Sequence, residues 1–267
     1  IIDDALASIK ERHGVVINPL TLPLDDKKTF NMLARGETKA GFQADGGTFT
    51  KWILENKCDE FMDLVRGTAI ARPGAKNTVG EIYRKRLLGE EMVHYPNDII
   101  YNITKDTLGC VVFQEQVMQM MTDLAGMSMA EANKVRKIIG KKRDVTEFEQ
   151  YRKTFVDGAS KHISVKDAES LWHDFEAHAG YSFNLSHAVA YSMVTYWTAY
   201  LKAHYPLEYM AAVLLAEENK EKITFHLIEA KRLGIPVYLP HVNYSQPGAS
   251  IQDDGIRLGL GNIKYVS

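Results

Sequence analysis

The chain has 267 residues, of which 45% are hydrophobic and 25% are charged, so it can bury a substantial core and we do not expect disorder. Its formal net charge is −2, so any affinity for nucleic acid must come from a local basic patch rather than from the field of the whole molecule. The widely separated Cys58 and Cys110 argue against a disulfide framework and a cysteine zinc site, and no apolar run reaches the roughly 18 residues of a membrane span.

Apolar residues recur at helical spacing over most of the chain, so we predict a mainly α-helical protein. Helices are predicted, in chain order, over residues 1–12, 27–35, 83–88, 114–125, 129–139, 146–161, 164–180, 186–205, 207–217 and 221–233. Between 67 and 102 the pattern weakens, and glycines and prolines mark turns. Residues 109–113 form a brief β-like run. A small β element at the C-terminal end is predicted from 237–239 and a hairpin across Asp254-Gly255.

Local signals predict several helix ends. Asp25 or Asp26 is placed to cap the second helix, and Ser186 is predicted to cap the long apolar helix that must end before Pro206. Starts of the capping-box type are predicted at Ser128 with Glu131, Thr146 with Glu149 and Ser164 with Asp167. Glycines are predicted to end helices at Gly14, Gly126, Gly140, Gly180 and Gly234.

The strongest concentration of charge lies between residues 134 and 143. It contains no acid, and its cations are Lys134, Arg136, Lys137, Lys141, Lys142 and Arg143. Cations near a helix C-terminus offset its partial negative charge by about 0.3–1 kcal/mol each, and charge runs are often only solvated surface. This cluster exceeds what a cap needs, and its members would repel one another without an anion between them. We therefore favour a polyphosphate or nucleic-acid backbone as its partner, with solvated surface as the alternative.

A second candidate anion site is the segment 180–187, in which a glycine leads into a predicted helix start. Free N–H groups and the helix dipole favour an anion there, and Ser186 and His187 add polar side chains. The alternative is that the serine is only a cap and the histidine a structural residue.

Metal and hydrolase motifs are missing from the sequence. His173 and His178 lie five positions apart on different helix faces, and there is no H-E-x-x-H, phosphate loop or nucleophile elbow. Two-metal chemistry needs converging carboxylates, whereas adjacent side chains point in different directions. The adjacent acids are Asp3-Asp4, Asp25-Asp26 and Asp253-Asp254. We therefore expect no catalytic and no metal-binding residue in this chain.

Ordered motifs run along nearly the whole chain. They are INPLTLPLDDKKTFNML at 17–33, GFQ at 41–43, ARPG at 71–74, VFQEQVMQ at 112–119, GKK at 140–142, AGY at 179–181, FN at 183–184, SH at 186–187, AY at 190–191 and LKAHYP at 201–206. In these motifs the chain resembles the alpha subunits of bacterial DNA polymerase III, the C-family replicative polymerases. The resemblance implies that 1–30 is the end of the palm and a connector, 31–236 an irregular multi-helix fingers domain, and 237–267 a small β element leading into the next domain.

The resemblance also implies roles for charged and polar residues. The residues implied to bind the incoming dNTP and its phosphates are Arg136, Lys137, Lys141, Lys142, Asn184, Ser186 and His187. Further candidates for contact with DNA or nucleotide are Arg72 and Arg143. The family often has lysine where this chain has Leu185, which indicates a divergent member such as a phage or plasmid polymerase.

The family's three catalytic aspartates lie in the palm, and the last of them would precede Ile1. The resemblance therefore implies an intact cytoplasmic DNA-directed DNA polymerase whose Mg²⁺ is held by palm residues outside this chain, so the chain alone should be inactive. Primer–template DNA and dNTP are the implied partners. The sliding clamp and other replisome subunits would bind regions outside the chain. The alternatives are a non-catalytic helical nucleic-acid-binding module and a protein-interaction module.

Overall fold

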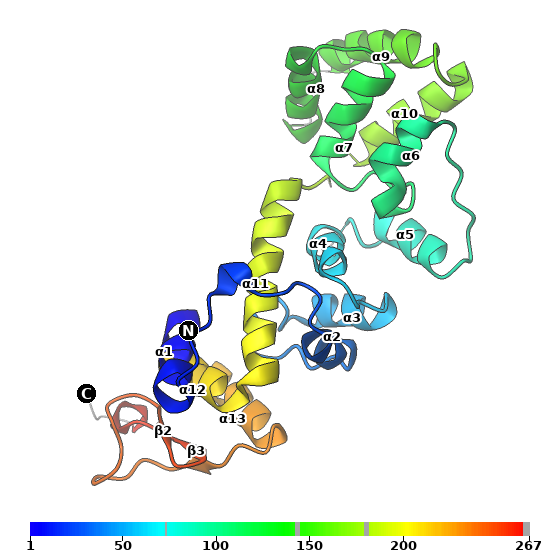
Figure 1. Cartoon of the computed structure of the whole chain (residues 1–267). Coiled ribbons are helices and arrows are strands. Elements are labelled where there is room, and N and C mark those ends of the chain that lie inside the picture. The colour runs from blue at the N-terminus through cyan, green and yellow to red at the C-terminus, as the bar shows by residue number, and fades with distance from the viewer. Residues whose placement is uncertain (73, 142–144, 179–181, 264–267) are drawn as a thin grey trace. The chain divides into compact units, whose positions relative to one another are not determined.

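The computed structural model describes residues 1–72, 74–141, 145–178 and 182–263, and for 139–141, 145–148 and 177–178 it describes the backbone alone. The chain is mainly α-helical, which confirms the predicted fold class (Figure 1). The helices are α1 (Ile2–His13), α2 (Lys27–Ala34), α3 (Gly47–Glu55), α4 (Phe61–Ile70), α5 (Val79–Leu87), α6 (Asp98–Thr104), α7 (Gln114–Gln119), α8 (Met129–Lys141), α9 (Val145–Ala159), α10 (Val165–His178), α11 (Leu185–His204), α12 (Pro206–Ala216) and α13 (Lys220–Arg232).

The chain forms two compact units. Unit 1 contains residues 1–64 and 192–267, and unit 2 contains residues 65–191. In unit 1, α1 packs against α12 because its buried face carries Ala5 and Ile9 (Figure 1). The core of unit 1 therefore joins the N-terminal helix to helices far along the sequence.

The small β element of unit 1 is a three-stranded sheet of β1 (Val237–Tyr238), β2 (Ser250–Gln252) and β3 (Gly255–Arg257) in the order β1-β3-β2. β1 runs parallel to β3, and β2 runs antiparallel to β3. The element and its hairpin are confirmed, but the predicted turn position is wrong.

The turn of the hairpin lies at Asp253 and Asp254, because Gln252 pairs with Gly255 in the ladder. Asp253 adopts a positive φ of 54°, so the left-handed turn conformation falls on an aspartate. Gly255 belongs to β3, where a Cβ would lie 2.6 Å from the Pro236 carbonyl oxygen. Close backbone approach, not the turn, therefore requires this glycine.

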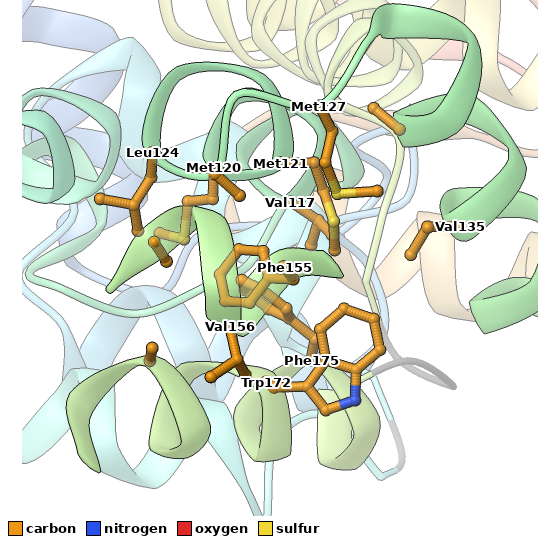
Figure 2. Close-up of a cluster of buried hydrophobic side chains, with 14 of the residues drawn as sticks. Val117, Met120, Met121, Leu124, Met127, Val135, Phe155, Val156, Trp172 and Phe175 are labelled. Carbon is orange, nitrogen blue, oxygen red and sulfur yellow. The ribbon is translucent and has the colours of Figure 1, made fainter. Parts of the chain in front are cut away.

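The core of unit 2 is formed by α6 to α10 and the π turn η3 (Met120–Leu124) that follows α7. Figure 2 shows the aromatic centre of this cluster, where the Phe155 ring centre lies 5.5 Å from that of Trp172 and 5.3 Å from that of Phe175. Tilted and edge-to-face aromatic pairs at such distances contribute about 0.5–1.5 kcal/mol each beyond the area they bury. The core thus packs α9 against α10, α8 and the π turn.

Several predicted helix ends are confirmed. Asp26 caps α2 by accepting the Thr29 N–H at 2.8 Å. Ser128 and Glu131 form the predicted capping box of α8, because the Ser128 N–H donates to the glutamate (2.9 Å) and the Glu131 N–H donates to the serine (3.3 Å). The other predicted ends that the structure confirms are Ser164 with Asp167 at α10, the end of α11 before Pro206, and the positive φ of Gly14, Gly126 and Gly234.

The predicted end of α8 at Gly140 is wrong, because the helix continues through Lys141. Glycine costs about 1 kcal/mol relative to alanine in a helix interior, which disfavours a helix there without preventing it. The predicted helix end at Gly180 lies outside the described residues, and α10 is described to His178.

The predicted cap of α9 at Thr146 is also wrong. The helix begins at Val145, so Thr146 lies inside it. Glu149 pairs with Arg152, 3.3 Å away and one turn further along the same helix. Residues three apart share a helix face, which is why the acid finds this partner.

The stretch 67–102 contains more helix than its turn residues predict. α5 already begins at Val79, and α6 begins at Asp98 after Asn97, whose side chain accepts the Ile100 N–H at 2.9 Å. Conversely, the helix predicted over 114–125 is α7 followed by the π turn. The β-like run at 109–113 forms no strand, although its last residue makes the isolated bridge described below.

Candidate nucleotide-binding site

The candidate site lies in unit 2, where the segment that begins α7 pairs with the segment that begins α11. Phe113 and Phe183 form an isolated parallel bridge. The Phe183 N–H donates to the Val112 carbonyl (3.0 Å), and the Gln114 N–H donates to the Phe183 carbonyl (2.9 Å). Backbone hydrogen bonds thus hold two helix starts side by side although about 70 residues separate them in sequence.

The N-terminus of α11 is capped by side chains of the protein itself. The Leu185 N–H donates to Glu115 Oε2 (2.9 Å), and the His187 N–H donates to Asn184 Oδ1 (2.8 Å). The Ser186 hydroxyl donates to the same asparagine oxygen (2.7 Å). Carboxylate and amide oxygens stabilise a helix start by accepting its orphan N–H groups, and the carboxylate also offsets the helix dipole.

One expectation for this helix start is therefore wrong, and a second is narrowed. Asn184, not Ser186, occupies the capping position, because α11 already begins at Leu185 and asparagine caps at least as well as serine. The N–H groups of Leu185 and His187 are also not free for an anion, because Glu115 and Asn184 accept them. These two N–H groups therefore do not contribute to an anion site here.

Arg136 on α8 is held by two neutral amide side chains. Its Nη1 donates to Gln114 Oε1 (3.0 Å), while Nε and Nη2 donate to Asn133 Oδ1 (3.1 and 3.0 Å). The Gln114 Nε2 in turn donates to the Ser182 carbonyl over a longer 3.4 Å. No carboxylate in the described part of the chain pairs with Arg136, so its position is set by amides that leave its positive charge intact.

Arg72 places a second cation beside the bridge. Its Cζ lies 4.3 Å from the centre of the Phe183 ring, and its Nε donates to the Ala69 carbonyl (2.8 Å). A guanidinium over an aromatic face is stabilised by the ring quadrupole. Burial lowers the pKa of Arg72, but an arginine remains protonated in a protein.

The His187 ring packs between two aromatic rings at the start of α11. Its centre lies 5.3 Å from that of Phe183 and 4.0 Å from that of Tyr191. The histidine is nevertheless exposed, so one face of this cluster is open to solvent or to a ligand.

The predicted site residues fall into three groups. Arg72, Asn184, Ser186 and His187 contact one another or share Phe183 as a partner. Arg136 reaches the same segment through Gln114, which also bonds Ser182 and Phe183. Lys137 is exposed on α8 next to Arg136. The backbone of Lys141 belongs to α8, and Lys142 and Arg143 lie outside the described residues.

Sequence reasoning missed the side chains that organise this site, namely Gln114, Glu115, Gln116 and Asn133. The buried Gln116 uses its whole amide: Oε1 accepts the N–H groups of Val112 (2.8 Å) and Phe113 (2.9 Å), and Nε2 donates to Thr107 (2.7 Å) and Ile103 (3.1 Å). The available signal was a run of three polar residues between the apolar Phe113 and Val117. Such a run at the start of a buried helix indicates polar side chains with fixed internal partners.

Within the described residues, no group of three or more histidine, cysteine, aspartate or glutamate side chains could hold a metal ion. None of the helices described for this chain is long and apolar enough to cross a membrane.

A family model for the bacterial DNA polymerase III alpha subunit finger domain matches residues 1–163. The chain is 41% identical over 261 residues to the DNA polymerase III subunit alpha of Aquifex aeolicus, an alignment that covers 97% of this chain and 22% of the relative. It is 39% identical over 272 residues to the subunit of Thermus aquaticus, with 99% and 22% covered. The corresponding protein of Mycobacterium tuberculosis is 36% identical over 274 residues, with 100% and 23% covered. The chain therefore spans about a fifth of the length of these relatives, and it belongs to the family of bacterial DNA polymerase III alpha subunits, within which it corresponds to the fingers.

Proposed function

We propose that this chain serves as the fingers of a DNA-directed DNA polymerase and binds the triphosphate of the incoming dNTP during template-directed synthesis. The relatives are named as subunits of DNA polymerase III, which supports a nucleotidyltransferase of DNA replication as the intact protein. In that role the fingers act by positioning the nucleotide and by offsetting its negative charge.

The observation that carries the proposal is the environment of Arg136. Its guanidinium is oriented by Gln114 and Asn133, and neither amide cancels its charge. Arginine prefers bidentate contact with phosphate oxygens, and a guanidinium already fixed in place loses little conformational freedom when it binds them. A preorganised, unneutralised arginine is what a triphosphate site needs.

The neighbouring residues extend this surface in the proposal. Lys137, Lys141 and Lys142 follow Arg136 with further positive charge, and Arg143 continues the same basic run. The segment with Asn184, Ser186 and His187 would contact the nucleotide and the primer terminus. Arg72, which lies over the Phe183 ring, would contact DNA or nucleotide as well.

The rest of the polymerase belongs to the same proposal. Residues 1–30 would end the palm, 31–236 form the fingers domain, and 237–267 lead into the next domain. The catalytic aspartates and their Mg²⁺ would be supplied by the palm outside this chain, so the isolated chain would not synthesise DNA. Primer–template DNA and dNTP would be its ligands in the cytoplasm, and the sliding clamp and other replisome subunits would bind other regions of the protein.

The test is primer extension by the intact polymerase that contains this chain. Arg136→Ala should raise KM for dNTP about tenfold or more and also lower kcat, because the triphosphate is held in both the ground state and the transition state. The matched control is Arg152→Ala in the same unit. Arg152 is already paired with Glu169 (2.6 Å) and Glu149 (3.3 Å), so its removal should change KM by less than about twofold.

Other outcomes would favour other functions. If Arg136→Ala left both kinetic constants unchanged but weakened salt-dependent DNA binding, the chain would be a nucleic-acid-binding module. If it changed neither kinetics nor DNA binding, the basic cluster would serve solubility or a protein partner. Either result would contradict the triphosphate assignment.

A further inference from the structure

We propose that Gln114 is the positioning residue that sets the guanidinium of Arg136 for the triphosphate. This inference rests on the proposed function of Arg136 and assigns to the glutamine a task that the basic cluster does not perform. Gln114 is the first residue of α7 and lies beside both the basic helix α8 and the segment that begins α11.

Gln114 is itself attached at three points. Its backbone N–H donates to the Phe183 carbonyl (2.9 Å), its Nε2 donates to the Ser182 carbonyl (3.4 Å), and its Oε1 accepts from Arg136 Nη1 (3.0 Å). Two of these bonds attach Gln114 to residues 182–183, and the third attaches it to the guanidinium of Arg136. Within the described part of the chain, the Gln114 side chain alone therefore links Arg136 to the segment that precedes Asn184.

The second support of the guanidinium comes from its own helix. Asn133, one turn earlier on α8, accepts from Nε and Nη2. A support on the same helix fixes the rotamer of Arg136 relative to α8 alone. Among the described residues, only Gln114 links the arginine to the segment that begins α11, so the two amides have different tasks.

The amide group is well suited to this task because it is a neutral acceptor. A carboxylate in the place of Gln114 would form a charge-assisted, bidentate pair with Arg136 and would compete with phosphate for the same N–H groups. Glutamine holds the arginine by hydrogen bonding without cancelling its charge. Its Nε2 also gives it an anchor at the Ser182 carbonyl that a carboxylate, which has no N–H, would lack.

Replacement of Gln114 separates this role from simple packing. Glutamate has nearly the same shape as glutamine, so a packing role predicts that Gln114→Glu is milder than Gln114→Met. The positioning role predicts the reverse, because the new carboxylate neutralises the arginine. In the intact polymerase, Gln114→Met should raise KM for dNTP roughly tenfold, and Gln114→Glu should raise it further.

A double-mutant cycle tests whether the glutamine acts through the arginine. In the Arg136→Ala background, Gln114→Met should raise KM for dNTP by less than about twofold, since no guanidinium remains to be positioned. Gln119→Glu is the matched charge control, because Gln119 is exposed on the same helix α7. It should leave KM unchanged.

The outcomes distinguish this inference from the function on which it rests. If Arg136→Ala leaves KM unchanged, the triphosphate assignment fails. If Arg136→Ala raises KM but the Gln114 variants do not, or if Gln114→Met has the same effect in both backgrounds, only the positioning role is overturned. Gln114→Glu preserves size and shape, so a milder effect than that of Gln114→Met overturns the inference even if the methionine variant is less stable.

Discussion

Lys202 on α11 and Glu229 on α13 form a 2.6 Å ion pair whose side chains are only 1% and 3% exposed. The same ammonium group donates to the carbonyls of Glu37 (2.9 Å) and Lys39 (2.7 Å). All three ammonium protons thus have acceptors, and two helices of unit 1 are tied to the segment that follows α2. Arg232 completes the network by pairing with the Glu229 carboxylate at 2.8 Å.

Replacement of Lys202 by methionine should strongly destabilise unit 1. Removing one partner of a buried ion pair costs about 3–5 kcal/mol, and the lower end applies here because Arg232 still pairs with Glu229. Urea unfolding of the chain measures the loss of free energy of unfolding. Lys220→Met, at an exposed position on α13, is the control and should change this free energy by less than about 0.5 kcal/mol. Equal effects of the two variants would contradict the network.

The Glu229 carboxylate should make unit 1 sensitive to acid. Burial by itself would raise the pKa of Glu229, but hydrogen bonds and charges from Arg232 and Lys202 outweigh it and lower the pKa from 4.5 to about 2. The ionised Glu229 carboxylate therefore contributes fully to the stability of unit 1 above pH 4.5, and this contribution is lost as the pH falls towards 2. Between about pH 6 and about pH 3, the melting temperature should fall less steeply for Glu229→Gln than for the unmodified chain. Parallel pH profiles would refute this assignment.

The carboxylate of Glu115 should stabilise the start of α11. Glu115→Ala removes the acceptor of the Leu185 N–H and should cost about 1 kcal/mol, as the loss of other helix caps does. Hydrogen exchange of the Leu185 amide should accelerate in proportion to this loss of stability at the helix start. Glu90→Ala, which removes an exposed carboxylate 3.7 Å from Arg84, is the control and should leave this amide unaffected. Unchanged protection of Leu185 in Glu115→Ala would exclude the cap.

Gly158 on α9 should not tolerate even a methyl group. A Cβ there would lie 2.0 Å from the Ala125 carbonyl oxygen, so Gly158→Ala must push α9 away from the end of the π turn. Overpacking of this kind costs about 1–3 kcal/mol or more. Gly47→Ala, at the open first position of α3, meets nothing within 4 Å and should stabilise the chain by about 0.4–1 kcal/mol. Urea unfolding of both variants measures the contrast, and a stabilised Gly158→Ala would contradict the close packing.

His187 offers a test of the segment that begins α11. If this histidine contacts the nucleotide or the primer terminus, His187→Ala in the intact polymerase should lower the rate of incorporation by at least about tenfold. Its ring also packs against Phe183 and Tyr191, so the thermal stability must be measured alongside. A variant with a lower melting temperature but normal incorporation would show that the ring only supports the helix start.

Features that depend on neighbours in the chain could be predicted from the sequence. Asp26 caps α2 and Ser128 with Glu131 caps α8 because these bonds close within one helical turn. The mainly helical fold follows from the apolar spacing for the same reason. The family was identified by ordered motifs, and the match of residues 1–163 to the finger domain confirms it. The triphosphate role of Arg136 remains a prediction.

Features that depend on partners distant in sequence were decided by the tertiary structure. The sequence placed Ser186 at the cap of α11, but Asn184 and Glu115 share that task because the Phe113–Phe183 bridge brings α7 to this helix start. Likewise, the basic run identified Arg136 as a candidate, but it did not predict the hydrogen bond from Arg136 to Gln114. Charge can be read along a chain, because each residue carries its own. The position of that charge and its neutralisation depend on side chains distant in sequence. The packing of unit 2 brings such a side chain, Gln114, to 3.0 Å from Arg136.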